Sequence, residues 1–189
     1  MNDFTFDVGL AFKLKQAAVR NGIEDAADID WLCQGKNLAD IRRVRLGYAA
    51  ITIPEHLIDL DTDPFVPKGW KVEEHRKGGH FKWDATKVVL YSSKRQRDGK
   101  WMTGDMLREE LKGKSVYNAN LLDYLLKHPL LIPEEWKGTP VSFWGTAYCH
   151  PDVRLFVRCL YWYGDWWHWR YCPLDGDWDG ANLAAVHVS

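Results

Sequence analysis

The stretch Val141–Pro173 decides the fold, and its sequence is VSFWGTAYCHPDVRLFVRCLYWYGDWWHWRYCP. Three runs rich in aromatic and β-branched residues are separated by two turn-forming segments, CHPDVR and GD. Such runs predict β-strands, and the short turns between them predict an antiparallel meander of three strands. Gly164 and Asp165 form the shorter turn, and glycine in its first position suits a type II′ hairpin.

The turns also predict which residues face each other across the strands. A two-residue turn places Tyr163 opposite Trp166 in the last two strands. A loop over His150–Val153 places Cys149 opposite Arg154 in the first two. Because side chains alternate between the two sides of a strand, this register predicts one apolar face and one face that is both aromatic and polar.

The apolar face is expected to pack on the core. Its members are Val141, Phe143, Gly145, Ala147, Phe156, Arg158, Leu160, Trp162, Trp167, Trp169 and Tyr171. We call the opposite side the mixed face, and it consists of Ser142, Trp144, Thr146, Tyr148, Leu155, Val157, Cys159, Tyr161, Tyr163, Trp166, His168, Arg170 and Cys172. Either a second layer covers the mixed face, or it is an exposed binding platform, since Trp, Tyr and Arg are typical of binding hot spots. The candidate partner-binding residues are Trp144, Tyr161, Trp166, His168 and Arg170.

Length and composition limit the classes of protein to consider. A chain of 189 residues is expected to form one domain, or one domain with a helical appendage. No apolar run approaches the length of a membrane span, and the first residues have no apolar core typical of a signal peptide. The four cysteines show no CxxC pair, so we expect reduced thiols and a cytoplasmic protein without a cofactor. The net charge of −1 favours no particular partner.

The pattern along the chain predicts an α+β fold. Apolar residues at helical spacing between Phe6 and Tyr48 indicate a helical N-terminal region, which we place at residues 1–58. Residues 59–189 are expected to form an α+β domain. It would contain two central helices, near 105–112 and 118–127, followed by the three-stranded meander at 141–173.

Several segments together resemble a known group of proteins. They are DTDPFVPKGWKVEEHRKGGHFKWD, KGKSVYNANLLDYLLKHPLLIPEEWKG, FWGTAY and VRCLYWYGDWWHW, in that order. The chain resembles, from about Ile58 to Val186, a recurrent group of bacterial hypothetical proteins found chiefly in candidate-phylum and metagenomic genomes. This resemblance implies a bacterial source. It implies no activity, cofactor or catalytic residue, because none is assigned to that group.

Motifs for metal binding and catalysis are weak. Asp175, Asp177 and Asp179 precede Gly180 as in the first half of a calcium loop, but Val186 occupies the position of the bidentate glutamate. No GxSxG, P-loop, GxGxxG or HExxH motif is present, so the sequence favours a binding protein over an enzyme. An enzyme of an unrecognised class stays open as an alternative.

A basic segment supports a second kind of binding. Lys94, Arg95, Arg97 and Lys100 are expected to form a loop beside Trp101. Cations that hold phosphates, next to aromatic rings on which bases stack, are typical of proteins that bind single-stranded nucleic acid. The leading hypothesis is a protein partner or self-association through the mixed face, and single-stranded RNA is the alternative.

Overall fold

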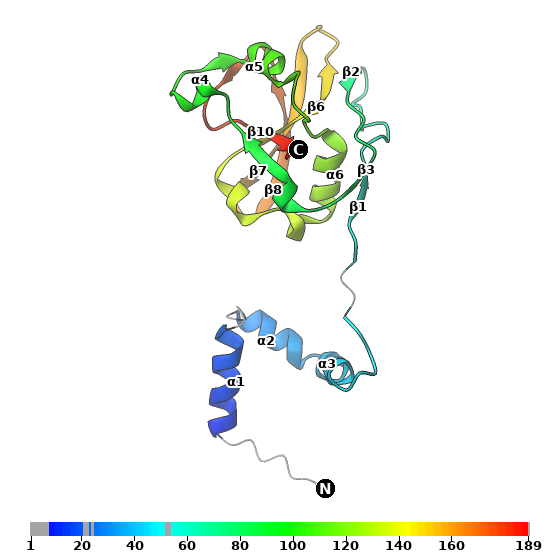
Figure 1. Ribbon diagram of the computed structural model, residues 1–189, viewed down its shortest axis with the longest axis vertical. Helices are drawn as coiled ribbons and strands as arrows, with labels where there is room; N and C mark the ends of the chain where they lie inside the picture. The colour runs from blue at the N-terminus through cyan, green and yellow to red at the C-terminus, as the bar shows by residue number, and fades with distance from the viewer. Residues whose placement is uncertain (1–7, 21–22, 24, 52–53, 189) are drawn as a thin grey trace. The chain divides into compact units, whose positions relative to one another are not determined.

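The computed structural model describes the chain apart from residues 1–7, 21–22, 24, 52–53 and 189 (Figure 1). The chain divides into two compact units, Met1–Pro54 and Glu55–Ser189. This boundary falls before residue 58 because strand β1 (Leu57–Asp59) already pairs with β3 (His80–Lys82) of the second unit.

The first unit contains three helices, which are α1 (Val8–Arg20), α2 (Ala26–Cys33) and α3 (Asn37–Arg45). Asp25 caps α2, because its carboxylate accepts a hydrogen bond from the backbone N–H of Ala27. No residue of α2 or α3 is buried, so neither helix contributes to a hydrophobic core. Phe6, the first residue of the expected apolar stripe, lies outside the described residues.

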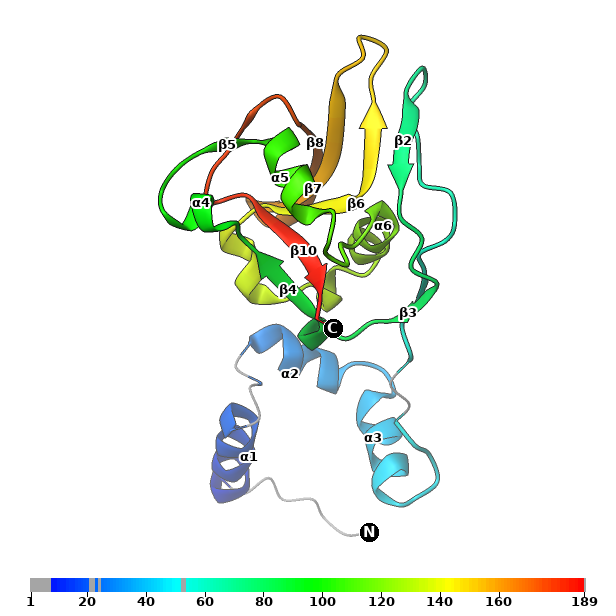
Figure 2. The ribbon, with the colours of Figure 1, turned by 45° about the horizontal axis from the view of Figure 1, so that its top comes forward.

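A six-stranded sheet forms the centre of the second unit (Figure 2). The strand order is β4-β10-β6-β7-β8, and β2 pairs with the end of β6. β10 runs parallel to β6, whereas the other pairs are antiparallel. The strands are β2 (Lys71–His75), β4 (Val88–Tyr91), β6 (Val141–Cys149), β7 (Leu155–Tyr163), β8 (Trp166–Pro173) and β10 (Leu183–His187).

The expected fold class was therefore wrong. The protein has a mixed α/β fold dominated by a six-stranded sheet, and not an α+β domain whose sheet is a three-stranded meander. The meander is only half of the sheet, since β2, β4 and β10 join it from distant parts of the chain. The sequence LAAVH of β10 shows no strand-like alternation, so its pattern does not predict a strand.

The register of the β7–β8 hairpin was predicted correctly. Tyr163 lies opposite Trp166 and Trp162 lies opposite Trp167. Gly164 has a φ of 63°, a left-handed backbone conformation that glycine adopts without steric cost. The two-residue turn thus fixes the hairpin as the sequence indicated.

The register of β6 against β7 was wrong. Cys149 lies opposite Leu155 rather than Arg154, and the pairing shifts again between Phe143 and Tyr148, where β6 is irregular. An irregularity of this kind, a β-bulge, moves the following side chains to the other side of the sheet. The residues of β6 beyond the irregularity therefore face the side of the sheet opposite to the one that a regular strand would give them.

Helices cover both faces of the sheet over β6. Leu121, Leu122 and Leu125 of α6 (Ala119–Lys127) pack with Phe143 and Leu160 on one face. On the other face, α5 (Gly104–Leu111), β5 (Met102–Thr103) and β9 (Asp177–Trp178) enclose a second apolar cluster. Burying one leucine side chain stabilises a fold by about 1.5–3 kcal/mol. The two apolar clusters therefore stabilise the packing of the sheet against the layers on its two faces.

Short elements complete the second unit. They are η1 (Ala85–Lys87), α4 (Lys94–Arg97), η2 (Pro129–Leu131) and η3 (Glu134–Gly138). None of the helices in the described part of the chain combines the length and the hydropathy that a bilayer-spanning helix needs.

Candidate partner-binding site

Trp144 does not belong to an exposed platform. Its side chain is 3% exposed, and its ring lies 4.8 Å from the ring of Trp178 in the apolar cluster beneath α5. The second layer covers the mixed face over β6, so Trp144 contributes to the core. This candidate is withdrawn, because a buried indole cannot contact a partner.

The other four candidates gather on one face of the β7–β8 hairpin, beyond the covered part of the sheet. Tyr161 lies opposite His168, and their stacked rings are 5.7 Å apart. The guanidinium of Arg170 lies 5.4 Å from the centre of the Tyr161 ring. Trp166 is 74% exposed at the end of the row. We call the five residues Tyr161, Tyr163, Trp166, His168 and Arg170 the hairpin ladder.

Tyr163 belongs to the hairpin ladder although the sequence analysis did not select it. Its ring lies 6.3 Å from that of His168 and is as exposed as Trp166. The register already placed it opposite Trp166, so the pairing itself carried the information needed to include it.

The opposite face of the hairpin is also aromatic. Trp162 and Trp167 meet edge to face at 5.3 Å, and Lys137 lies 4.1 Å from the Trp162 ring. Trp169 covers the guanidinium of Arg158 at 4.1 Å. These contacts hold the hairpin against the α6 side of the sheet, so the hairpin ladder is presented on a stiff support.

Arg158 anchors this support in the interior. It is 1% exposed, and its Nη2 donates to the carboxylate of Asp123 in α6 at 2.7 Å. Burial lowers the pKa of Arg158, but the hydrogen bond and charge of Asp123 outweigh burial and raise it. Nε and Nη1 of Arg158 have no hydrogen-bond partner in the described structure, nor do the hydroxyls of Tyr148 and Tyr171. Asp123 is therefore the acid that offsets the buried charge of Arg158.

β8 is the last strand in the order of the sheet. Half of the backbone N–H and C=O groups of such an edge strand point away from its neighbour and can pair with another strand. Four of the five residues Trp166–Arg170 are exposed, which agrees with an open edge. Proteins usually protect edges with charged side chains, proline or bulges, and in β8 Arg170 and the terminal Pro173 are the residues of these types.

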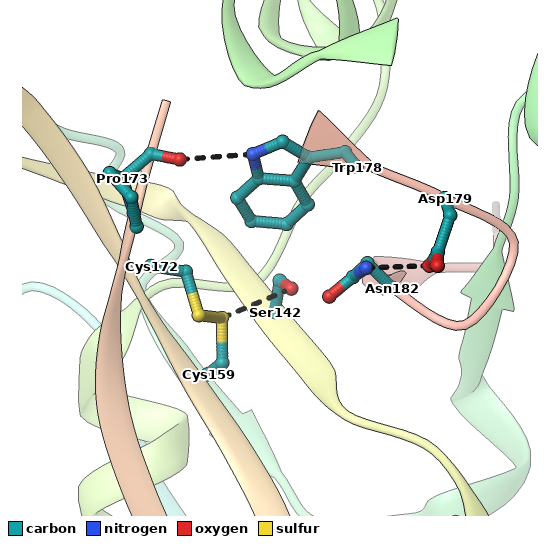
Figure 3. Close-up of a disulfide and its surroundings, with 7 residues drawn as sticks. All are labelled: Ser142, Cys159, Cys172, Pro173, Trp178, Asp179 and Asn182. Carbon is teal, nitrogen blue, oxygen red and sulfur yellow. Dashed lines mark hydrogen bonds between the residues drawn. A yellow bond between two sulfur atoms is a disulfide. The ribbon is translucent and has the colours of Figure 1, made fainter. Parts of the chain in front are cut away.

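A disulfide between Cys159 and Cys172 joins β7 to β8 (Figure 3), on the same face of the two strands as the hairpin ladder. Both residues are buried, their Cα atoms are 6.4 Å apart, and Ser142 Oγ lies 3.4 Å from Cys159 Sγ. The expectation of reduced thiols was wrong at this pair. Diagonal positions in the two strands remain within the Cα–Cα range of disulfides. Cys33 and Cys149 are free.

We expect reduction of this disulfide to lower the free energy of unfolding by roughly 2 kcal/mol, since the bond closes only a short loop of the unfolded chain. Urea unfolding with and without dithiothreitol measures the change. The variant Cys33→Ser, which alters an exposed free cysteine, is the control and should leave stability unchanged. An equal midpoint with and without reductant in the wild type would show that the bond adds nothing.

The basic segment forms a helix rather than a loop. Ser93 and Gln96 form a capping box that begins α4, and the Gln96 amide donates to the backbone carbonyls of Asp179 and Asn182. Trp101 is 63% exposed. Lys94, Arg95 and Lys100 line a cavity of about 480 Å³ together with Asp98 and Glu110, and Arg97 donates to the carbonyl of Ser92.

Acidic residues therefore lie among the cations of α4. Asp98 and Glu110 reduce the positive potential that phosphates need. The aromatic residues of the hairpin ladder do not line this cavity. The structure thus does not bring the basic segment and the sheet aromatics into one site.

The aspartates after β8 are not arranged as metal ligands. Asp177 pairs with Thr103 in the β5–β9 ladder, and Asp179 accepts hydrogen bonds from Ala181 N and Asn182 Nδ2 (Figure 3). Within the described residues, no group of three His, Cys, Asp or Glu side chains could hold a metal ion, and Asp175, Asp177 and Asp179 form no such group.

No protein-family model matches the chain, no curated protein is significantly similar to it, and no solved structure matches it.

Proposed function

We propose that the protein is a binding protein that uses the β7–β8 hairpin to bind another protein, and that this partner is a second copy of the same chain. The observation that carries the proposal is an exposed, stiffly supported row of aromatic and cationic side chains beside an open sheet edge.

The composition of the hairpin ladder supports a protein partner. Trp, Tyr and Arg are enriched among the residues that contribute most to protein interfaces. Tyr161, His168 and Arg170 already contact one another, so little side-chain freedom is left to lose on binding. A rigid row of this kind loses less entropy on association than isolated flexible side chains would.

The open edge of β8 supports a second copy as the partner. Identical edge strands can pair antiparallel about a two-fold axis, which makes the surface complementary to itself. Pairing of the two β8 strands would satisfy the outward backbone groups of Trp166–Arg170. It would also bring two hairpin ladders side by side, so backbone and aromatic contacts would form together.

We expect Trp166→Ala to weaken dimerisation by about 2 kcal/mol or more, which is roughly 30-fold in the dissociation constant. Sedimentation velocity over a concentration series measures that constant. Trp101→Ala is the matched control, because it removes an exposed tryptophan outside the hairpin ladder.

Two results would contradict the proposal. One is a wild-type protein that stays monomeric up to roughly 100 μM, a concentration at which specific dimers of this kind form. The other is an equal loss of dimer in the Trp101→Ala control. A labelled single-stranded RNA that bound the monomer and dissociated steeply with salt would instead favour the nucleic-acid alternative.

A further inference from the structure

The second unit contains a cavity of about 560 Å³ that the hairpin does not line. Its wall combines four segments that are far apart in the sequence. They are the loop RKGGH between β2 and β3, the segment before α6, Leu60 after β1, and His187 at the end of β10. This volume falls in the range of sites for small molecules.

The polar part of the wall is basic. Arg76, Lys77 and Lys114 line the cavity together with His80 and His187, and no aspartate or glutamate lines it. The nearby acids are engaged elsewhere.

The engaged acids are Asp59, Asp61 and Glu74. Asp61 accepts a hydrogen bond from Gly79 N at 2.8 Å, and Asp59 accepts from Asp61 N and from Thr62. These hydrogen bonds hold the two aspartates in position, and neither carboxylate lines the cavity. The charged side chains that line the cavity itself are all basic.

Arg76 is held in place by its own network. Its Nε donates to Glu74 at 2.6 Å, and its Nη1 donates to the carbonyls of Leu111 and Lys114. Glu74 also accepts from Arg108 at 2.9 Å, so one carboxylate is shared by two guanidinium groups. Burial opposes ionisation of Glu74, but the hydrogen bonds from the two arginines outweigh it and lower its pKa. The three charged groups keep a net positive charge.

Asn118 links two segments of the cavity wall by hydrogen bonds. Its side-chain amide donates to the carbonyl of Leu60 at 2.7 Å and to that of Arg76 at 3.0 Å. Gly78 packs against Leu60 so closely that an added Cβ would lie 2.8 Å from Leu60 Cδ1. The loop is therefore fixed in position before any ligand arrives.

Part of the cavity wall is apolar. Leu60, Phe81, Val116 and Tyr117 line it, and the Phe81 and Tyr117 rings are 5.1 Å apart. Lys114 also lines the cavity, and its Nζ lies 4.4 Å from the centre of the Tyr91 ring, which is not part of the cavity wall. A cavity lined by both cations and aromatic rings suits a molecule with a phosphate group at one end and an apolar part at the other.

We propose that this cavity binds a small phosphorylated molecule, with the phosphate on Arg76, Lys77 and Lys114 and the apolar part on Phe81 and Tyr117. The proposal is independent of dimerisation through the hairpin. It assigns a role to the loop RKGGH, and it adds Lys114 and His187, which no sequence pattern connected.

Isothermal titration with phenyl phosphate, inorganic phosphate and phenol tests this. We expect phenyl phosphate to bind about tenfold more tightly than inorganic phosphate, and phenol not to bind, because charge and ring act together. The double variant Lys77→Gln/Lys114→Gln should weaken phenyl phosphate binding by about tenfold or more. Lys94→Gln/Arg95→Gln, with the same charge change at α4, is the control and should stay within about twofold.

Two results would overturn the proposal. One is the absence of saturable heat when the wild type is titrated to about 10 mM phenyl phosphate, since binding would then be weaker than a built site allows. Alternatively, the control pair could weaken binding as much as the cavity pair, which would show attraction to general positive charge only. Circular dichroism of both double variants verifies that they are folded.

Discussion

Replacing Asp123 by alanine is expected to lower the free energy of unfolding by about 3–5 kcal/mol. Arg158 is almost completely buried, and Asp123 is the acid with which it forms an ion pair. Without that carboxylate the guanidinium would stay in the interior with its charge uncompensated. Urea unfolding followed by tryptophan fluorescence measures the loss.

Two matched variants separate this effect from the loss of any ion pair. Glu109→Ala breaks the exposed pair with Lys112 and should cost less than about 1 kcal/mol. The double variant Asp123→Leu/Arg158→Met removes both charges and should recover much of the stability. A loss for Asp123→Ala no larger than for Glu109→Ala would refute the assigned role of the buried pair.

Gly145→Ala is expected to destabilise the protein by about 3 kcal/mol or more. A Cβ at this position would lie 2.8 Å from the backbone N of Asn118 and 2.9 Å from its Cα. Backbone atoms cannot move aside as a flexible side chain can. Gly145 N also donates to the carbonyl of Tyr117, and its own carbonyl accepts from Arg76 N, so a shift would break both bonds. Thermal and urea unfolding measure the effect.

Gly113→Ala is the control for this substitution. An added Cβ at Gly113 would meet no atom within 4 Å, so we expect a change of less than about 0.5 kcal/mol. If Gly145→Ala destabilised the protein as little as Gly113→Ala, β6 would be packed less closely against the start of α6 than the structure indicates.

Those features of the fold that local interactions determine could be predicted from the sequence. Gly164 and Asp165 set the turn, and the turn set the register of β7 against β8. The residues of the hairpin ladder follow from that register alone. The boundaries of α5 and α6 also follow locally, because Thr103 and Asn118 cap them.

Tertiary contacts explain what the sequence could not predict. The irregularity in β6 lies where Gly145 meets Asn118, a residue far away in the sequence. It turns Thr146 toward α6, where its hydroxyl accepts a hydrogen bond from Ala119 N. Trp144 was misassigned because nothing near it in the sequence reveals that Trp178 covers it.

The basic cavity was missed for the same reason. Its cations come from separate segments, and His187 lies near the start of α6 because its backbone N donates to the carbonyl of Ser115 and Val186 bridges to Val116. The spacing of these residues along the sequence does not indicate that they lie together in the fold. The disulfide depends likewise on diagonal neighbours in two strands, whose distance the register alone does not fix.

Hydrogen–deuterium exchange of β8 tests pairing through the hairpin most directly. The protein is labelled at about 1 μM and about 100 μM, and exchange of the Trp166–Arg170 amides is compared. We expect slower exchange of these amides at the higher concentration, and unchanged exchange in β10, which is already enclosed between β4 and β6. Equal exchange of the β8 amides at both concentrations would contradict self-association through this edge.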